Sequence, residues 1–224
     1  MITFQIENHK LKQTALILVL ILLTATRTMA QDADYGKSGI DIQSGIVPHG
    51  LKAGDKAPAF SGYDQTGKRV SSGKILETGP IVLFFYRGKW CSVDSKSLNN
   101  YQDSLNILTG MGVNVVAITP ESVENVEETV KFHNITYTVI YDCQEQIMKD
   151  YGLFYNVTKE YQEKIRKTLN IDIAVNNGRD AAHLPVPATY IINRQGYVTA
   201  VFFDTDYTHR ASVSWVIRNL ASAL

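Results

Sequence analysis

Cys91 and its neighbours are the residues of this chain best suited to chemistry. They lie in the stretch PIVLFFYRGKWCSVD, which runs from Pro80 to Asp94. A cysteine thiolate is a strong nucleophile, and it forms most readily beside positive charge or at the start of a helix. Arg87 and Lys89 would supply the charge, so a reactive thiol would be expected to have a lowered pKa. A buried, inert cysteine is the alternative, because free cysteine is among the most buried residue types.

The elements that would position Cys91 are a strand before it and a helix after it. Residues 81–86 form an unbroken apolar run, which is typical of a strand buried on both faces of a sheet. Asp94 would lie in the first turn of the helix, where a carboxylate mainly stabilises the positive helix end and secondarily could shuttle a proton, while its charge opposes a nearby thiolate. Apolar residues after Cys91 recur at the spacing of an amphipathic helix: Leu98, Tyr101, Leu105 and Leu108.

The middle of the chain repeats this strand and helix pattern. Residues 113–119 and 136–142 predict two more buried strands, and each is followed by a stretch with helical spacing. Ser122 is expected to cap the first of these two helices, and Asn134 to end it. Three such strand and helix pairs imply a parallel sheet with right-handed crossovers.

The last third of the chain predicts an insertion, a hairpin and a closing helix. Residues 184–193 and 197–204 predict two antiparallel strands joined by a turn, and apolar residues within 213–224 predict the final helix. Residues 153–184 are less regular. One helix is expected there, marked by Tyr161, Ile165 and Leu169.

Several short motifs in this order carry a family resemblance. YRGKWC, at 86–91, resembles the YRG-x-WC segment of the peroxiredoxin-like branch of the alkyl hydroperoxide reductase and thiol-specific antioxidant family, in the thioredoxin superfamily. GDKAPAF at 54–60 resembles the entry segment of peroxiredoxin and thioredoxin-like families, and VPAT at 186–189 is similar to a segment of thioredoxin-like proteins. DYTHR at 206–210 resembles a D-Y-x-x-R motif of the branch. The resemblance covers roughly residues 51–224. It implies an α/β, thioredoxin-like fold: a mixed central sheet flanked by helices, with an N-terminal hairpin and a helical insertion.

The resemblance also implies roles for individual residues. Cys91 would be the reactive thiol, and Arg87 and Trp90 would shape its pocket. Pro187 would be a cis-proline that packs beside Cys91 and presents the substrate backbone. In the branch, Trp-Cys is usually followed by proline, one residue and a second cysteine, but here the second cysteine position is Asp94. In ordinary peroxiredoxins the peroxide-attacking cysteine aligns with that second position.

Three functions therefore remain open. The first is an exported, thiol-dependent antioxidant oxidoreductase of peroxiredoxin type that reduces peroxides through Cys91. The second is a thioredoxin-like disulfide oxidoreductase acting on exported proteins, and the third is a redox-inactive binding module that lost its second cysteine to Asp94. The first two would need a peroxide or disulfide substrate and a thiol reductant such as a thioredoxin-like protein, with no cofactor and no metal.

Cys143 is the candidate resolving thiol. Its strand should lie two places from the strand of Cys91, with both cysteines at the same edge of the sheet. Two strand spacings amount to roughly 10 Å, whereas a disulfide needs Cα atoms within about 7 Å. An inert structural Cys143 is therefore favoured, and a resolving role is the alternative.

The first thirty residues predict a secretory signal peptide. Lys10 and Lys12 form a basic start, residues 15–23 are continuously apolar, and Thr28-Met29-Ala30 is typical of a cleavage site. The chain is therefore expected to be periplasmic or secreted, and to meet a membrane only through an uncleaved leader.

Composition and charge bear on the number of domains and on the kinds of ligand the protein could bind. Residues 31–50 are mostly polar and predict a linker that tethers a single domain at 51–224 and takes no part in its core. The chain has no formal net charge, and residues 31–224 carry −2. This argues against a nucleic-acid-binding protein, because such proteins usually show a basic patch.

Overall fold

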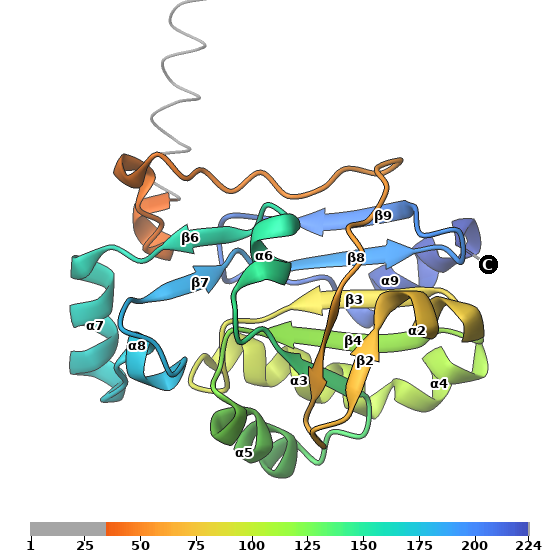
Figure 1. Ribbon diagram of the computed structural model, residues 1–224, viewed down its shortest axis with the longest axis horizontal. Helices are drawn as coiled ribbons and strands as arrows, with labels where there is room; N and C mark the ends of the chain where they lie inside the picture. The colour runs from red at the N-terminus through yellow and green to blue at the C-terminus, as the bar shows by residue number, and fades with distance from the viewer. Residues whose placement is uncertain (1–34, 224) are drawn as a thin grey trace, which may run out of the picture.

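A central mixed sheet organises the described part of the chain, residues 35–223 of the computed structural model (Figure 1). Within those residues seven strands pair in the order β2-β1-β5-β4-β3-β8-β9. Their bounds are β1 (Ser61–Asp64), β2 (Arg69–Ser71), β3 (Ile81–Phe85), β4 (Asn114–Thr119), β5 (Thr138–Tyr141), β8 (Ala188–Ile192) and β9 (Val198–Phe203). Strands β3, β4 and β5 run parallel, as the repeated strand and helix pattern predicted, and β1 and β8 pair antiparallel to either side of them.

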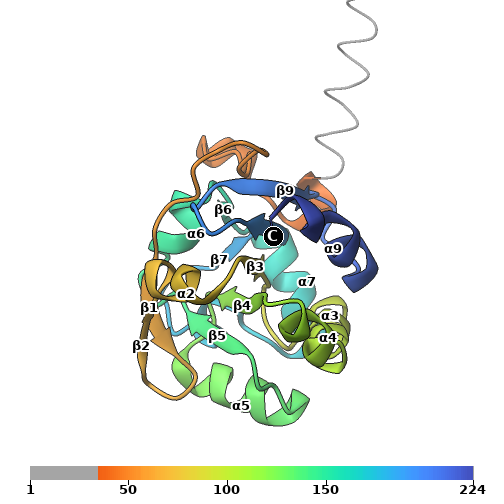
Figure 2. The same cartoon turned by 90° about the vertical axis from the view of Figure 1, so that its right-hand side faces the viewer.

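Helices cover both faces of this sheet (Figure 2). Their bounds are η1 (Ile42–Ser44), α2 (Ser72–Thr78), α3 (Ser92–Asp103), α4 (Leu105–Gly110), α5 (Val123–His133), α6 (Gln146–Asp150), α7 (Lys159–Leu169), α8 (Ile173–Asn176), α9 (Val213–Asn219) and η2 (Leu220–Ser222). Helices α3, α4, α5 and α9 pack on one face, and α6, α7 and α8 contribute to the core on the other.

The central strand β3 is buried because both of its faces are covered. Ile81, Leu83 and Phe85 belong to one hydrophobic cluster, and Val82 and Phe84 belong to the cluster on the opposite face. All five are at most 3% exposed. Burying such a side chain stabilises a fold by roughly 1.5 to 3 kcal/mol, so β3 is a rigid base for the residues that follow it.

The helix ends follow the local sequence. Ser122 caps α5 by accepting a hydrogen bond from the Asn125 amide, and Asn134 ends α5 in the left-handed conformation with φ 51°, as expected. The helix expected after Cys91 is interrupted at Ser104, so that it forms α3 and α4 in place of one continuous element.

The insertion between β5 and β8 packs at the end of the sheet where β3 and β4 finish, on the left of Figure 1. Helix α7 forms as predicted and buries Tyr161 and Ile165, whereas Leu169 is 48% exposed. Sequence periodicity did not predict the second, two-stranded sheet of this region. It pairs β6 (Phe154–Asn156) with β7 (His183–Pro185), and each strand is too short to show an alternating pattern.

Tyr35 and Ile40 take part in the core, which corrects the expectation that residues 31–50 stay outside it. Tyr35 and Ile40 are at most 5% exposed and belong to the same hydrophobic cluster as β3. Ile40 forms a β-bridge with Val157, so the insertion supplies the apolar surface that this segment covers. The expected signal peptide lies outside the described residues. Between residues 35 and 223 no helix is long and apolar enough to cross a membrane.

Candidate active site at Cys91

Cys91 lies where β3 gives way to α3. It is the N-cap residue of α3, with extended backbone angles, and only 4% of its surface is exposed. Residues 86–90 connect it to the strand. Gly88 in this loop has φ 149°, and a Cβ added there would lie 2.5 Å from the indole nitrogen of Trp90 and 2.9 Å from Glu121. Only glycine fits this position, so the loop's path toward Cys91 is fixed by its sequence.

Arg87 is buried and faces the thiol. Its Nη2 donates to Cys91 Sγ at 2.9 Å, and its Nη1 donates to Tyr161 Oη at 2.9 Å. The guanidinium carbon lies 3.9 Å from the ring centroid of Tyr207 and 5.2 Å from that of Trp90. The arginine is 1% exposed. Its charge is therefore held among aromatic rings and directed at the sulfur.

Asp94 joins the loop to the far end of the chain. It is completely buried, and its Oδ1 accepts from Arg210 Nε at 3.1 Å and Nη2 at 2.5 Å. Its Oδ2 accepts the backbone amide hydrogen of Arg87 at 3.0 Å. We expected this carboxylate mainly to stabilise the start of the helix. Asp94 does lie in the first turn of α3, so this role stays a prediction. Its oxygens are also taken by the guanidinium of Arg210 and by the backbone of Arg87, whose side-chain Nε lies 3.8 Å from Oδ2.

The pKa of Cys91 is raised, in contrast to the lowered value expected of a reactive thiol. Burial is the largest cause and the charge of Asp94 the second, while Arg87 and the backbone amide of Asp94 act in the opposite direction. The resting sulfur is therefore mostly a thiol at neutral pH. Deprotonation depends on a balance between the charges of Asp94 and Arg87.

Replacing Asp94 by asparagine should lower the pKa of Cys91, because the charge of Asp94 is the second-largest cause of its rise. The amide keeps an acceptor for the Arg87 backbone, but it removes the negative charge that opposes the thiolate. The ultraviolet absorbance of the thiolate, followed against pH, measures this shift. Asp103→Asn is the matched control, because Asp103 is an exposed residue at the end of the same helix. An unchanged or higher pKa in Asp94→Asn would contradict this electrostatic account.

Glu121 holds the loop before Cys91 in place, and it was not identified as a site residue from the sequence. It is 1% exposed, its Oε1 accepts the backbone amide hydrogen of Lys89 at 3.1 Å, and its Oε2 accepts from Thr129 Oγ1 at 3.2 Å. Burial raises the pKa of Glu121 to about 7. The side chain of Lys89 forms an ion pair with Glu128 on α5. The only sequence signal for Glu121 was its place just after Pro120, which follows a buried strand.

Tyr161 and Tyr207 were also missed as site residues. Tyr161 comes from α7 in the insertion, and Tyr207 comes from the DYTHR segment after β9. Their rings lie 6.3 Å apart, edge to face. Together with Trp90 they enclose the guanidinium of Arg87, so segments distant in sequence complete the surroundings of Cys91.

Pro187 is buried immediately before β8, at the end of the sheet where β3 runs out. The expected cis bond is absent, since no peptide bond within residues 35–223 is cis. Its chain continues from β7 into β8 with only Val186 and Pro187 between them, and a trans bond is favoured by roughly 0.5 to 1 kcal/mol before proline. Presentation of substrate by Pro187 stays a prediction.

Cys143 follows β5, two strands from β3 as expected. Both cysteines are free; Cys143 is exposed and Cys91 is buried. Cys143 lines a cavity of about 480 Å³ to which Cys91 does not contribute. The structure therefore brings Arg87, Trp90, Asp94 and Cys91 together and leaves Cys143 outside this group. Its resolving role stays a prediction.

Comparison with known proteins identifies the family. Residues 53–201 match the AhpC/TSA family. The chain is 27% identical over 106 residues to peroxiredoxin Bcp of Escherichia coli, a match that covers 46% of this chain and 66% of that protein. It is 26% identical over 130 residues to chloroplastic peroxiredoxin Q of Oryza sativa, with 58% of each covered.

Solved structures agree on the fold. Peroxidoxin BcpB from Mycobacterium tuberculosis superimposes with a TM-score of 0.58 at 19% identity, covering 77% of this chain and 96% of that one. A peroxiredoxin-like protein from Aquifex aeolicus gives a TM-score of 0.59 at 19% identity, covering 80% and 91%. The motifs, the sheet and these matches agree, and the chain belongs to the AhpC/TSA family as a peroxiredoxin-like protein with a thioredoxin-like fold.

Proposed function

We propose that the protein is a thiol-dependent peroxidase in which Cys91 attacks the peroxide. The observation that carries this proposal is the contact between Arg87 Nη2 and Cys91 Sγ at the start of α3. A buried guanidinium in contact with a thiol favours the thiolate, which is the reacting species. Membership in the AhpC/TSA family and the peroxiredoxin relatives support the same reaction class.

The reaction begins when Cys91 loses its proton. The thiolate attacks one peroxide oxygen, the O–O bond breaks, and the sulfur becomes sulfenic acid while the other oxygen leaves as water or an alcohol after taking a proton. A thiol reductant then attacks the sulfenic sulfur, releases water and forms a disulfide, which a second thiol reduces. Asp94 stands at the second cysteine position, so the first of these thiols comes from a separate molecule, such as a thioredoxin-like protein, or from Cys143.

The burial of Cys91 favours a small substrate. Only 4% of the residue is exposed, and Trp90 and Tyr207 lie over the arginine beside it. In this conformation the thiol can admit hydrogen peroxide or a small organic peroxide, whereas a second protein, whether as disulfide substrate or as the later thiol reductant, reaches the sulfur only after the residues around it move. We therefore place peroxide ahead of protein disulfide as the substrate.

One observation favours the redox-inactive binding module as a second candidate. Cys91 combines burial with a raised pKa, which is typical of an inert cysteine. The two candidates differ in how fast Cys91 reacts, and this rate separates them.

The deciding experiment compares the two cysteines within one molecule. Reduced protein is mixed with hydrogen peroxide, the sulfenic acid is trapped with a dione reagent, and mass spectrometry assigns the modification to each cysteine over time. A peroxidase oxidises buried Cys91 faster than exposed Cys143, with a rate that increases with pH because the pKa of Cys91 is raised. If Cys143 were oxidised as fast as Cys91 or faster, the peroxidase proposal would be wrong and the redox-inactive binding module would be favoured.

Export rests on residues 1–30 of the sequence alone. A leader of this type supports a periplasmic or secreted enzyme. N-terminal sequencing of protein recovered from the periplasmic or medium fraction should begin at Gln31. Recovery of the intact leader in the cytoplasm would contradict the proposal.

A further inference from the structure

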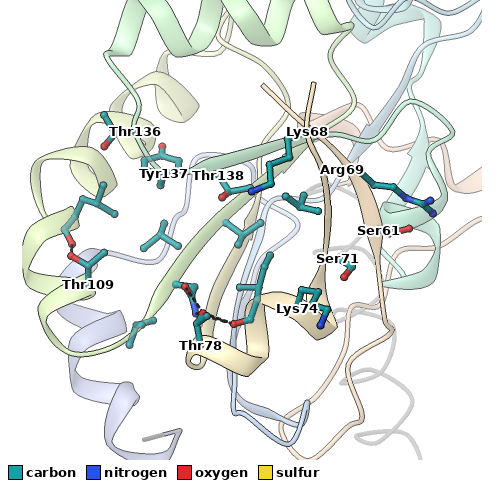
Figure 3. A pocket seen from close by; sticks show the side chains of 17 residues that line it. Ser61, Lys68, Arg69, Ser71, Lys74, Thr78, Thr109, Thr136, Tyr137 and Thr138 are labelled. Carbon is teal, nitrogen blue, oxygen red and sulfur yellow. Dashed lines mark hydrogen bonds between the residues drawn. The ribbon is translucent and has the colours of Figure 1, made fainter. Parts of the chain in front are cut away.

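A large cavity lies at the opposite end of the sheet from Cys91. It has a volume of about 870 Å³ and opens between the β1–β2 hairpin, α2, α4 and the first residues of β4 and β5 (Figure 3). The first residues of β4 pair with the first residues of parallel β3, whereas Cys91 follows the last residue of β3. Helices α2 and α4 mark this end on the right of Figure 1. A ligand in the cavity would therefore not touch the thiol.

The charged residues that line the cavity are all basic. Lys68, Arg69 and Lys74 contribute to its wall, and no aspartate or glutamate does. Lys74 pairs with exposed Glu77, but neither Lys68 nor Arg69 forms a side-chain ion pair within residues 35–223. In Figure 3 the amine of Lys68 extends over the cavity toward Thr138, while the guanidinium of Arg69 points away from it. The chain as a whole has no net charge, so this excess of positive charge is local.

The floor of the cavity is apolar. It is formed by side chains from the hairpin, α2, α4 and the start of β4: Val70, Ile75, Leu105, Val115 and Val116. Hydroxyl groups also line the cavity, among them those of Ser71 and Thr138 (Figure 3). Small-molecule sites commonly combine a volume of about 300 to 1,000 Å³ with an apolar lining and a few polar groups. This cavity has both properties.

We propose that the cavity is a binding site for an amphipathic anion, with a carboxylate or phosphate group at Lys68 and an apolar chain along the floor. Charge complementarity selects the head group, because an anion meets an ammonium group and hydroxyl donors with no opposing carboxylate. The half-buried side chains of Val70, Ile75 and Leu105 select the chain, because covering them removes apolar area from water. The site is independent of the peroxidase proposal, since it neither contains nor contacts Cys91.

Two amphipathic anions and three compounds that carry only the head or only the chain test both halves of the site with the full-length protein. Dodecanoate and dodecyl phosphate carry an anionic head and a chain, dodecanol carries the chain alone, and acetate and inorganic phosphate carry the head alone. Titration calorimetry gives the affinities, and amide chemical-shift changes in the magnetic resonance spectrum locate the site. We expect the amphipathic anions to bind at least about tenfold more tightly than dodecanol, with shifts at residues 68–75 and 136–138. The stronger of dodecanoate and dodecyl phosphate identifies the preferred head group.

A charge reversal tests the role of Lys68 directly. Lys68→Glu should weaken dodecanoate binding by about tenfold or more, because it places a carboxylate beside the anionic head. Lys164→Glu is the matched control, since Lys164 is an exposed lysine on α7, outside the cavity. Equal binding of dodecanol and dodecanoate, equal effects of the two charge reversals, or shifts confined to residues outside the cavity would each overturn the proposal.

Discussion

Replacing Cys91 by serine should abolish the fast consumption of peroxide. Serine has nearly the size of cysteine, and its hydroxyl can still accept the hydrogen bond that Arg87 donates to the sulfur. It is not ionised at neutral pH and cannot form a sulfenic acid, so the fold is preserved while the chemistry is lost. Peroxide consumption by one equivalent of reduced protein, followed in a stopped-flow instrument, measures the effect.

Cys143→Ser is the matched control for this loss. The first oxidation of Cys91 should proceed at the wild-type rate in Cys143→Ser, because Cys143 lies outside the group of residues that contact the thiol. Repeated turnover with a thiol reductant should slow in this variant only if Cys143 resolves the sulfenic acid. Fast peroxide consumption that survives in Cys91→Ser would assign the reaction to another residue and end the proposal.

The strand before Cys91 and the helix after it could be predicted from sequence, because each depends on residues that are neighbours in the chain. The apolar run before Cys91 and the helical spacing after it required only the periodicity of a few residues. Both were confirmed by β3 and α3, and so was the parallel pairing of β3 with β4. Family motifs then supplied the thioredoxin-like fold. The break at Ser104 was missed, since the apolar spacing continues through it.

The contacts of the site could not be predicted because they join distant segments. Asp94 meets Arg210 across 116 residues, and Arg87 meets Tyr161 across 74. A pattern read over ten or twenty consecutive residues cannot show which distant side chains will meet. The direction of the Cys91 pKa was missed for the same reason: burial is its largest cause, and residues from the insertion and the DYTHR segment help to enclose the site.

Tyr35 and Ile40 illustrate a further limit. Their stretch of sequence is polar overall, so composition indicated a tether. Two apolar side chains are nevertheless enough to fix a segment when a partner surface exists, and that surface is formed by residues of the insertion such as Val157. Composition describes a segment by itself, whereas its burial depends on the element against which it packs.

Arg87→Met should give the second large effect, a fall in the rate of Cys91 oxidation at neutral pH by about ten- to a hundredfold. Arg87 supplies the positive charge that opposes burial and Asp94 at the thiol. Losing an opposite charge in contact raises the pKa of a thiol. Each unit of such a rise lowers the thiolate fraction at neutral pH about tenfold. Methionine fills a similar volume with an apolar chain, so the surrounding rings of Trp90 and Tyr207 can remain packed.

The pH profile separates this electrostatic role from a structural one. If Arg87 acts through the pKa of Cys91, the rate profile of Arg87→Met shifts to higher pH and reaches the wild-type plateau once the thiol is fully ionised. Arg87→Lys should shift less than Arg87→Met, because lysine keeps the charge but lacks the planar fork that reaches Cys91 and Tyr161 together. Arg194→Met, an exposed arginine at the β8–β9 turn, is the control and should leave the profile unchanged. A lower plateau rate without a shift along the pH axis would contradict this account. It would mean that Arg87 holds the loop in place and does not set the pKa of Cys91.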